Sequence, residues 1–353
     1  MSCPVNIVGL SACFPSRVKR NSDFPWAAAG LKPERIDRTG IEERRWAEPH
    51  ETILDLARGA CENALETARV RPEEVDRLFL VTSTLRPGIV VPSGAVILQD
   101  QLGMRRCQAT TLLETCCGSL VAMEHASALI RSGMARNVVV VASETFSKTF
   151  NPTSPVTFEI GMSMGDGAAA VVLSGREDLA DGLVTSFTRS CSDFQGGLGM
   201  RPLSLELEGL RESRIAFGAS GGPPTFRGQP VAGGELIEAL KWFTTSTVPM
   251  AVAEALREAR LSPEEVNFYV LHQPNRTFLE GWKRVARIPE ERTLDTLARY
   301  GNLSSVSVLA NLHAAWELGR LNVDDIVLMA SAGEGATWGA MVWKWRLPRE
   351  DQH

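Results

Sequence analysis

The chain has 353 residues, of which 44% are hydrophobic, and this suits one large or two medium globular domains. Its formal net charge of −5 argues against nucleic-acid binding, because domains that bind nucleic acids are usually basic. No apolar stretch is long enough for a membrane helix, and the seven cysteines lack C-x-x-C pairs and Cys/His ligand spacing, which argues against disulfides and metal sites. We therefore expect a cytoplasmic protein that binds neither membranes nor nucleic acids.

Short β-branched runs alternate with stretches of helical periodicity, which predicts an α/β fold. In the first half, strands are predicted at residues 5–10, 78–83, 110–113, 138–142 and 168–173. A helix is predicted at 120–130, where apolar residues recur three and four positions apart. In the second half, strands are predicted at 183–187, 268–271, 326–330 and 340–345, and a helix at 308–318.

The two halves present these elements, their turns and their Gly-rich segments in the same order. This order predicts a duplicated β/α unit, with halves at residues 1–175 and 176–353 related by a pseudo-twofold axis. Residues 192–234 interrupt the pattern with repeated glycines and little periodicity. Long irregular inserts are commonly functional or disordered, so we expect either a cover over a substrate channel or a disordered surface segment.

Cys116 lies between a predicted strand and a helix that begins near residue 119. Unpaired amides and the helix dipole would favour a thiolate there, and the same amides could hold an oxyanion. A buried structural cysteine is the alternative. The neighbouring Cys117 is expected to point the other way and to pack in the core.

His272 follows a strand, at the end where α/β folds place reactive groups, and Asn302 precedes a helix. Each residue also has an ordinary structural explanation, as a hydrogen-bonded histidine and as a helix cap. If the halves superpose, however, Asn302 occupies the turn equivalent to that of Cys116. Both helix starts would then meet at the centre beside His272, which predicts one site.

At these residues the chain resembles β-ketoacyl-acyl-carrier-protein synthase III and its relatives in the thiolase superfamily. The resemblance covers nearly the whole chain. The matching motifs are Arg38-Thr39-Gly40-Ile41, Pro92-Ser93, Cys116 with the helix ending at Ser132-Gly133, Gly165-Asp166-Gly167-Ala168, His272-Gln273-Pro274-Asn275, Tyr300-Gly301-Asn302 and Gly335-Ala336-Thr337-Trp338-Gly339.

The resemblance implies a five-layered αβαβα fold, a homodimer, and a catalytic triad of Cys116, His272 and Asn302. In that family the cysteine takes an acyl group from a thioester. The histidine and the asparagine stabilise the enolate of a second thioester, which then attacks the acyl-enzyme. An acyl carrier protein delivers substrate, and no metal or other cofactor is needed.

Several positions depart from the family pattern. Glu34 stands where a tryptophan commonly stacks on coenzyme A, and Thr277 replaces an arginine on the same path. Both changes favour substrates that are bound to a carrier protein. Val91 replaces a bulky residue that limits the acyl pocket across the dimer, which suggests a longer or branched chain.

Two carboxylates near the expected site are also unusual for the family. Glu334 interrupts a glycine run, and its backbone N–H is expected to complete an oxyanion hole with that of Cys116. Glu114 lies two residues before the nucleophile, in the expected substrate pocket. Each carboxylate is a base that removes an α-proton, a partner in a structural ion pair, or a solvated side chain.

A basic stripe follows His272 and is expected to dock the acidic carrier protein, although a solvated face is the alternative. The residues predicted to form the docking surface are Arg38, Arg276, Lys283, Arg284 and Arg287. Arg276, Lys283 and Arg287 recur at helical spacings of seven and four.

The resemblance and its departures favour a Claisen-type condensing enzyme of polyketide or fatty-acid-derived natural product biosynthesis. Joining two acyl chains, as α-pyrone-forming relatives do, is the specific hypothesis. Transfer of the acyl group to an alcohol or amine, and a non-catalytic chain-length or scaffold role, are the two alternatives.

Overall fold

The computed structural model describes residues 3–25, 34–84, 92–149, 161–191, 199–202, 213–216, 225–226, 229–230, 233–333 and 336–349. Two larger sheets dominate this part of the chain. The first sheet has the order β1-β7-β6-β4-β5, and the second has the order β13-β14-β15-β8. Strand bounds in the first sheet are β1 Asn6–Cys13, β4 Arg77–Val81, β5 Gln108–Leu112, β6 Asn137–Glu144 and β7 Gly167–Ser174. In the second they are β8 Leu183–Ser190, β13 Phe268–Leu271, β14 Ile326–Gly333 and β15 Thr337–Lys344.

Strand directions in the two sheets correspond. In the first sheet β4 is parallel to β6, β6 is antiparallel to β7, and β7 is antiparallel to β1. In the second, β13 is parallel to β14, β14 is antiparallel to β15, and β15 is antiparallel to β8. The first sheet carries β5 in addition, parallel to β4 at its edge. This correspondence is what a duplicated unit predicts, while the boundary at residue 175 stays a prediction.

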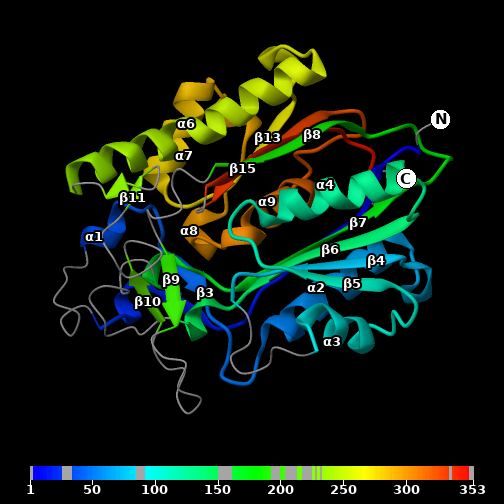
Figure 1. The fold of residues 1–353 in the computed structure, drawn as a ribbon, viewed down its shortest axis with the longest axis horizontal. Coiled ribbons are helices and arrows are strands. Elements are labelled where there is room, and N and C mark those ends of the chain that lie inside the picture. Colours follow the sequence, from blue (N-terminus) through cyan, green and yellow to red (C-terminus); the bar gives the residue numbers. More distant parts are fainter. Residues whose placement is uncertain are drawn as a thin grey trace.

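Helices surround and separate the sheets in layers (Figure 1). The helices are α1 Glu34–Asp37, α2 Ile53–Ala68, α3 Gly94–Gln101, α4 Gly118–Arg131, α6 Gly233–Ala259, α7 Arg276–Ala286, α8 Leu297–Tyr300 and α9 Ser307–Glu317. Helices α2 and α3 pack on the outer face of the first sheet. Helix α6 packs on the second sheet, and α7 packs against α6. Helices α4 and α9 lie between the sheets and contact both of them. The five-layered arrangement predicted above is therefore confirmed.

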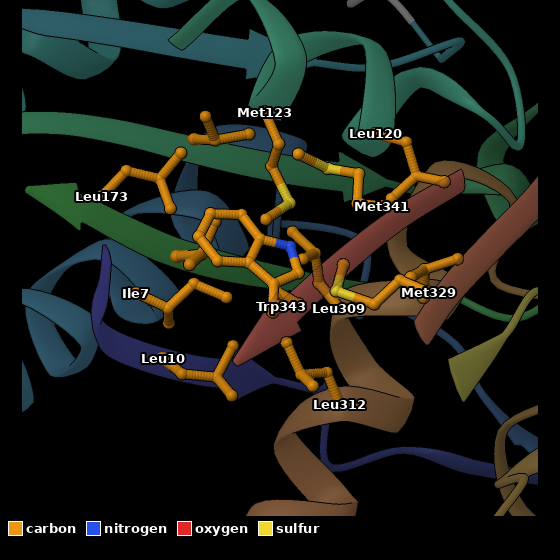
Figure 2. Close-up of a cluster of buried hydrophobic side chains, with 14 of the residues drawn as sticks. Ile7, Leu10, Leu120, Met123, Leu173, Leu309, Leu312, Met329, Met341 and Trp343 are labelled. Atoms are coloured by element: carbon orange, nitrogen blue, oxygen red, sulfur yellow. The ribbon is translucent and has the colours of Figure 1, made fainter. Parts of the chain in front are cut away.

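The layer between the sheets is filled with apolar side chains (Figure 2). The fully buried indole of Trp343, on β15, lies among Met123 of α4 and Leu309 and Leu312 of α9. Removing such large side chains from water is the main stabilising term for a core of this kind. The two central helices are therefore firmly held, and so are the turns at which they begin.

Smaller strands lie outside the two sheets. These are β2 Val18–Arg20 paired with β3 Glu43–Arg45, β9 Gly199–Pro202 with β10 Ser213–Ala216, and β11 Thr225–Phe226 with β12 Gln229–Pro230. The last two pairs fall within residues 192–234, for which the sequence predicted an irregular segment. The rest of that segment up to α6 lies outside the described residues, and so does its expected role as a cover. Each predicted strand and helix of the two sheets and the central layer is present, with ends shifted by a few residues.

Candidate active site

Cys116 lies in the turn between β5 and α4, as predicted, and its side chain is partly buried. The turn is closed by a hydrogen bond from the Gly118 amide to the Thr115 carbonyl, at 2.8 Å. The hydroxyl of Ser331, on β14 of the second sheet, donates to the Cys116 carbonyl at 2.7 Å. The turn is thus fixed from both halves of the chain.

Cys117 behaves as a core residue, as the sequence predicted. It is fully buried, belongs to the apolar cluster between the sheets, and lies 3.9 Å from the Ser331 carbonyl. Burial, reinforced by the carboxylate of Glu114, raises the pKa of the Cys117 thiol well above its ordinary value. Its thiol is therefore held protonated and apart from solvent, whereas that of Cys116 is more accessible.

A close backbone approach occurs beside the Cys116 amide. A Cβ atom at Gly333, the last residue of β14, would lie 3.1 Å from the Cys116 nitrogen and 3.3 Å from the Cys117 nitrogen. Because glycine has no Cβ atom, the backbone of β14 can approach the amides at the start of α4 this closely. Glu334 follows Gly333 but lies outside the described residues, as does Val91.

His272 directly follows β13 and is only 1% exposed. Its backbone amide donates to the Ala330 carbonyl of β14 at 3.0 Å, which extends the parallel ladder by one residue. Burial lowers the pKa of its imidazole to about 3, so the ring is neutral at physiological pH. Its Nδ1 atom has no hydrogen-bond partner among the described residues, and the centroid of its ring lies 6.3 Å from that of the Trp282 ring.

Gln273, next to His272, connects this strand end to the turn that carries Asn302. Its side-chain nitrogen donates to the Gly301 carbonyl at 2.9 Å, and its side-chain oxygen accepts from the Thr296 amide at 2.9 Å. The backbone amide of Asn302 donates to the Ser163 carbonyl at 2.8 Å. These bonds hold His272 and Asn302 in adjacent positions.

Ser304 links Asn302 to Cys116, and the sequence analysis gave it no role. Its backbone amide donates to Oδ1 of Asn302 at 2.9 Å, and its hydroxyl lies 3.8 Å from Sγ of Cys116. Because Oδ1 is engaged, the Nδ2 group of Asn302 is the end left to donate to a ligand. Ser304 has a positive φ of +50°, an uncommon conformation for a residue with a side chain.

Contacts therefore bring the three predicted site residues to one place. Asn302 and Cys116 both contact Ser304, while Cys116 and His272 both bond to adjacent residues of β14, at Ser331 and Ala330. The arrangement offers a thiol in the turn after β5, a neutral imidazole at the end of β13, and a side-chain amide in the turn between α8 and α9. Such a set can form a covalent thioester and can stabilise negative charge on a carbonyl oxygen.

Glu114 lies close to this group of residues. It is partly buried, and a Cβ atom at Gly118 would meet its Cβ at 2.8 Å and that of Ser305 at 3.9 Å. Among the described residues, its carboxylate has no hydrogen-bond or ion-pair partner. Glu114 therefore places a carboxyl group beside the Cys116 turn without an ion pair in the described part of the chain, which fits a base or a solvated side chain better than a structural ion pair.

The predicted basic stripe is divided in the structure. Arg276 forms a two-pronged ion pair with Asp295, at 2.8 and 3.1 Å, and Lys283 is 5% exposed and paired with Glu280 and Glu290, each at 2.8 Å. Acidic side chains from α7 itself and from residues 290–295 thus pair with these two basic residues, while a docking role for the stripe stays a prediction.

The remaining basic residues of the stripe are exposed. Within the described chain, Arg38, Arg284 and Arg287 form no ion pair. Arg287 caps the end of α7 with a left-handed backbone. Arg38 lies near the start of this helix, because the carbonyl of the next residue, Thr39, accepts from the Arg276 amide at 2.7 Å. Free positive charge thus remains at both ends of α7.

Comparison with known proteins agrees with this geometry. Residues 112–191 match the family "3-Oxoacyl-[acyl-carrier-protein (ACP)] synthase III", and residues 245–345 match its C-terminal counterpart. The chain is 32% identical to the β-ketoacyl-[acyl-carrier-protein] synthase III of Brucella suis over 339 residues, which are 96% of this chain and 98% of that protein.

Solved structures show the same fold. The β-ketoacyl-[acyl-carrier-protein] synthase III of Thermus thermophilus superposes with a TM-score of 0.80 at 29% identity, covering 97% of this chain and 100% of the other. The priming β-ketosynthase of the R1128 polyketide pathway gives a TM-score of 0.83 at 25% identity, covering 99% and 98%.

The predicted thiolase-like fold, with two mixed sheets, is thereby confirmed. Within the described residues, no helix combines the length and the apolar character needed to cross a bilayer. The extent of the sequence match and the shared fold together identify the chemistry. The chain belongs to the β-ketoacyl-[acyl-carrier-protein] synthase III family, and it is a condensing acyltransferase of the Claisen type.

Proposed function

We propose that Cys116 carries the acyl group and that His272 and Asn302 stabilise the enolate that attacks it. The Cys116 thiolate attacks the thioester of the first substrate, and the carrier thiol leaves. The enolate of the second thioester then forms a carbon–carbon bond with the acyl carbon, and the Cys116 thiolate leaves in turn. The observation that carries this proposal is the double contact of Ser304, to Sγ of Cys116 and to Oδ1 of Asn302.

The charge states of these groups suit the reaction. A neutral His272 can donate one N–H to the carbonyl oxygen of the second thioester, beside the Nδ2 group of Asn302. We assign the oxyanion on the acyl-enzyme to the backbone amides of Cys116 and Glu334, the pair that the sequence predicted. The two negative charges of the reaction thus have separate donors.

Intact mass spectrometry tests this assignment. After mixing with an acyl-carrier substrate, the protein is expected to gain the mass of one acyl group. The adduct disappears in Cys116→Ala and persists in Cys117→Ala, which removes a neighbouring thiol from the core. An adduct that survives in Cys116→Ala overturns the assignment.

The carrier protein docks at the ends of α7. Curated relatives are named for acyl-carrier-protein substrates, and Glu34 and Thr277 remove features that favour coenzyme A. Arg284, Arg287 and Arg38 supply free positive charge for an acidic carrier, whereas Arg276 and Lys283 are already neutralised. Docking therefore depends on the first three residues.

A charge reversal with a matched control tests this surface. Replacing Arg284 and Arg287 together by Glu is expected to lower kcat/KM for the acyl-carrier by about tenfold at low salt, with kcat nearly unchanged. The control is Arg69→Glu, because Arg69 is also exposed and caps its helix, α2, with a left-handed backbone on the opposite outer layer. Equal effects of the two changes contradict the docking proposal.

The chain forms a homodimer through β5. This strand ends the first sheet, and Leu113, directly after it, is 64% exposed. The Gln108 amide and the Leu112 carbonyl bond toward β4, so Ala109 presents its N–H outward. Among the described strands β5 pairs only with β4, and a sheet edge of this kind is a template for a second copy.

Proline at position 109 tests the dimer. Ala109→Pro removes an outward N–H without breaking a bond to β4, and is expected to give monomers in light scattering. Ala109→Val keeps the N–H and is expected to stay dimeric. A dimeric Ala109→Pro protein with unchanged circular dichroism contradicts an interface along β5.

The second substrate is a carrier-bound β-ketoacyl or acyl chain, so that the enzyme links two chains. Three sequence features support this: the small Val91, the departures at Glu34 and Thr277, and the presence of Glu114 two residues before Cys116. The likeness to a polyketide priming ketosynthase agrees with this class of product. In this scheme Glu114 removes an α-proton from the second thioester, so that no carbon dioxide need be lost.

Two measurements test the second half-reaction. Offering acylated enzyme a carrier-bound β-ketoacyl chain is expected to give a carbon–carbon-linked product, detected by mass spectrometry of the released material, with α-pyrone as the cyclised form. Exchange of the substrate α-proton is expected to be lost in Glu114→Gln. Exchange that continues unchanged removes Glu114 from the mechanism without affecting the assignment of Cys116.

A further inference from the structure

Glu144, the last residue of β6, is a fully buried carboxylate that no step above uses. It accepts hydrogen bonds from two chain segments that belong to different halves of the molecule. Its partners are the Thr82 hydroxyl, the amides and hydroxyls of Ser83 and Thr84, and the Ser305 hydroxyl.

Burying an ionised carboxylate costs free energy, and even these bonds do not fully offset that cost. Desolvation raises the pKa of Glu144 to about 6, in spite of the donors around it. A hydrophobic residue would avoid this cost, so the carboxylate has to be explained by what it holds. The bond that reaches furthest along the chain is the one from Ser305, at 2.7 Å.

Ser305 directly follows the residue that contacts both Asn302 and Cys116. Ser304 keeps its positive φ of +50° only if its surroundings hold it there. On one side its amide is bonded to Asn302 Oδ1, and on the other the hydroxyl of Ser305 is bonded to Glu144. Movement of Ser305 away from Glu144 would therefore displace the Ser304 hydroxyl from Sγ of Cys116.

We propose that Glu144 is a positioning residue that fixes the Asn302–Ser304 turn against Cys116 through Ser305. It touches no substrate in this scheme. The role in condensation rests on the function proposed above, whereas the effect on the Cys116 thiol can be measured without any substrate.

The chain offers a matched pair of substitutions two residues apart. Ser305→Ala removes the bond to Glu144. Ser307→Ala removes a hydroxyl that is equally buried but has no hydrogen-bond partner in the described part of the chain. Both substitutions remove one buried serine hydroxyl, Ser305 in the 3-10 turn and Ser307 at the first position of α9, so a difference between the two variants reports the contact to Glu144.

The first readout is alkylation of Cys116 by iodoacetamide at fixed neutral pH, followed by mass spectrometry. Ser305→Ala is expected to slow alkylation about tenfold, since misplacing a reacting group by about 1 Å can cost up to a hundredfold in rate. Ser307→Ala is expected to react like the unaltered protein. Equal rates in the two variants overturn the proposal, whether or not the protein condenses acyl chains.

The second readout separates positioning from general loss of structure. In the condensation assay, Ser305→Ala is expected to lower kcat about tenfold while KM for the acyl-carrier stays the same. Glu144→Gln is combined with Ser305→Ala in a double-mutant cycle. If Glu144 acts through Ser305, the alkylation rate of the double variant equals that of Glu144→Gln alone.

Additive effects in the cycle contradict the proposal. If Glu144→Gln fails to fold, the pair Ser305→Ala and Ser307→Ala still decides it. If the unaltered protein alkylates as expected but gives no condensation product, the proposed function fails and the positioning role stands.

Discussion

The turns before α4 and α9 occupy corresponding places in the two halves. Helix α4 leads to β6 and helix α9 leads to β14, and each of these strands pairs with the antiparallel strand that follows it, β7 or β15. The backbones of the two turns differ. At the first turn Cys117 already has helical angles, φ −88° and ψ −6°, and α4 begins at the next residue. At the second turn Gly301 and Ser304 have positive φ, and one 3-10 turn (Ser304–Val306) precedes α9.

The difference shows how a repeated unit acquires two chemical roles. The short turn leaves backbone amides near a thiol, which suits nucleophilic attack and an oxyanion. The longer turn uses strained backbone to aim a side-chain amide. Strain of this kind persists only where neighbouring contacts hold it, and here those contacts come from Gln273, Ser163 and Glu144.

The largest effect is expected where the second turn meets the substrate. Asn302→Asp keeps the oxygen that accepts from the Ser304 amide but replaces the donating Nδ2 with a second oxygen. Condensation is expected to fall by about 10²- to 10³-fold, as for loss of an oxyanion donor, while Cys116 is still acylated. Steady-state kinetics and intact mass spectrometry measure the two steps.

Asn275→Asp is the control for that change, because its side-chain oxygen caps α7 by accepting from the Phe278 amide and this bond survives. It is expected to leave both steps unchanged. If Asn302→Asp condenses at the normal rate, the second turn does not supply a donor and the contrast between the turns has to be abandoned.

A smaller effect is expected from the backbone of the second turn. Gly301 has φ 68° and ψ −159°, a region almost restricted to glycine, and a Cβ atom there would lie 2.7 Å from the Ser163 carbonyl oxygen. Gly301→Ala is expected to cost about 1–3 kcal/mol in the free energy of unfolding. Urea denaturation measures it, and a cost below about 0.5 kcal/mol, typical of a neutral surface change, would show that the turn is not strained.

These turns also mark where sequence reasoning succeeded. The strands that end at His272 and lead to Cys116 were predicted because apolar periodicity and turn residues define them locally. The order of elements further predicted two matching sheets. From the residues themselves, Asn302 was joined to Cys116 by assuming that the halves superpose, and the family resemblance implied the same triad; the shared contact with Ser304 supports that step.

The roles of Ser304, Glu144 and the paired basic residues could not be predicted in the same way. Ser304 matters because of one dihedral angle, and Glu144 because Ser305, far away in the sequence, folds onto it. The stripe on α7 could not reveal these ion pairs, because helical spacing gives no information about Asp295 and Glu290, which approach from a later segment. Tertiary contacts between distant segments decide all three.

The pH dependence of stability tests the anchor of the second turn. Burial raises the pKa of Glu144 from 4.5 to about 6, so between these pH values the folded protein binds more protons than the unfolded chain. The contribution of Glu144 to the free energy of unfolding is fully present below about pH 4.5 and is lost as the pH rises through 6. Glu144→Gln lacks this titration.

Glu144→Gln is therefore expected to lower the free energy of unfolding by about 1–2 kcal/mol more near pH 5 than near pH 7.5. Asp166, whose pKa burial also raises to about 6, titrates in both proteins and cancels in the comparison. Urea denaturation of the two proteins at both pH values measures the difference. A cost that is the same at both pH values, or larger at pH 7.5, would show that Glu144 is ionised in the fold over the whole range.

The smallest effect is expected at the first turn, where two adjacent thiols have opposite surroundings. Cys117→Ala removes a sulfur from the packed core and is expected to cost about 1 kcal/mol in the free energy of unfolding. The alkylation rate of Cys116 should not change, because the Cys117 thiol points into the apolar cluster and not toward the site. Slower alkylation in this variant would mean that the packing beneath the turn, and not only its amides, sets the reactivity of Cys116. The turn before α4 would then depend on packing of Cys117 in the apolar cluster, just as the turn before α9 depends on the hydrogen bond to Glu144.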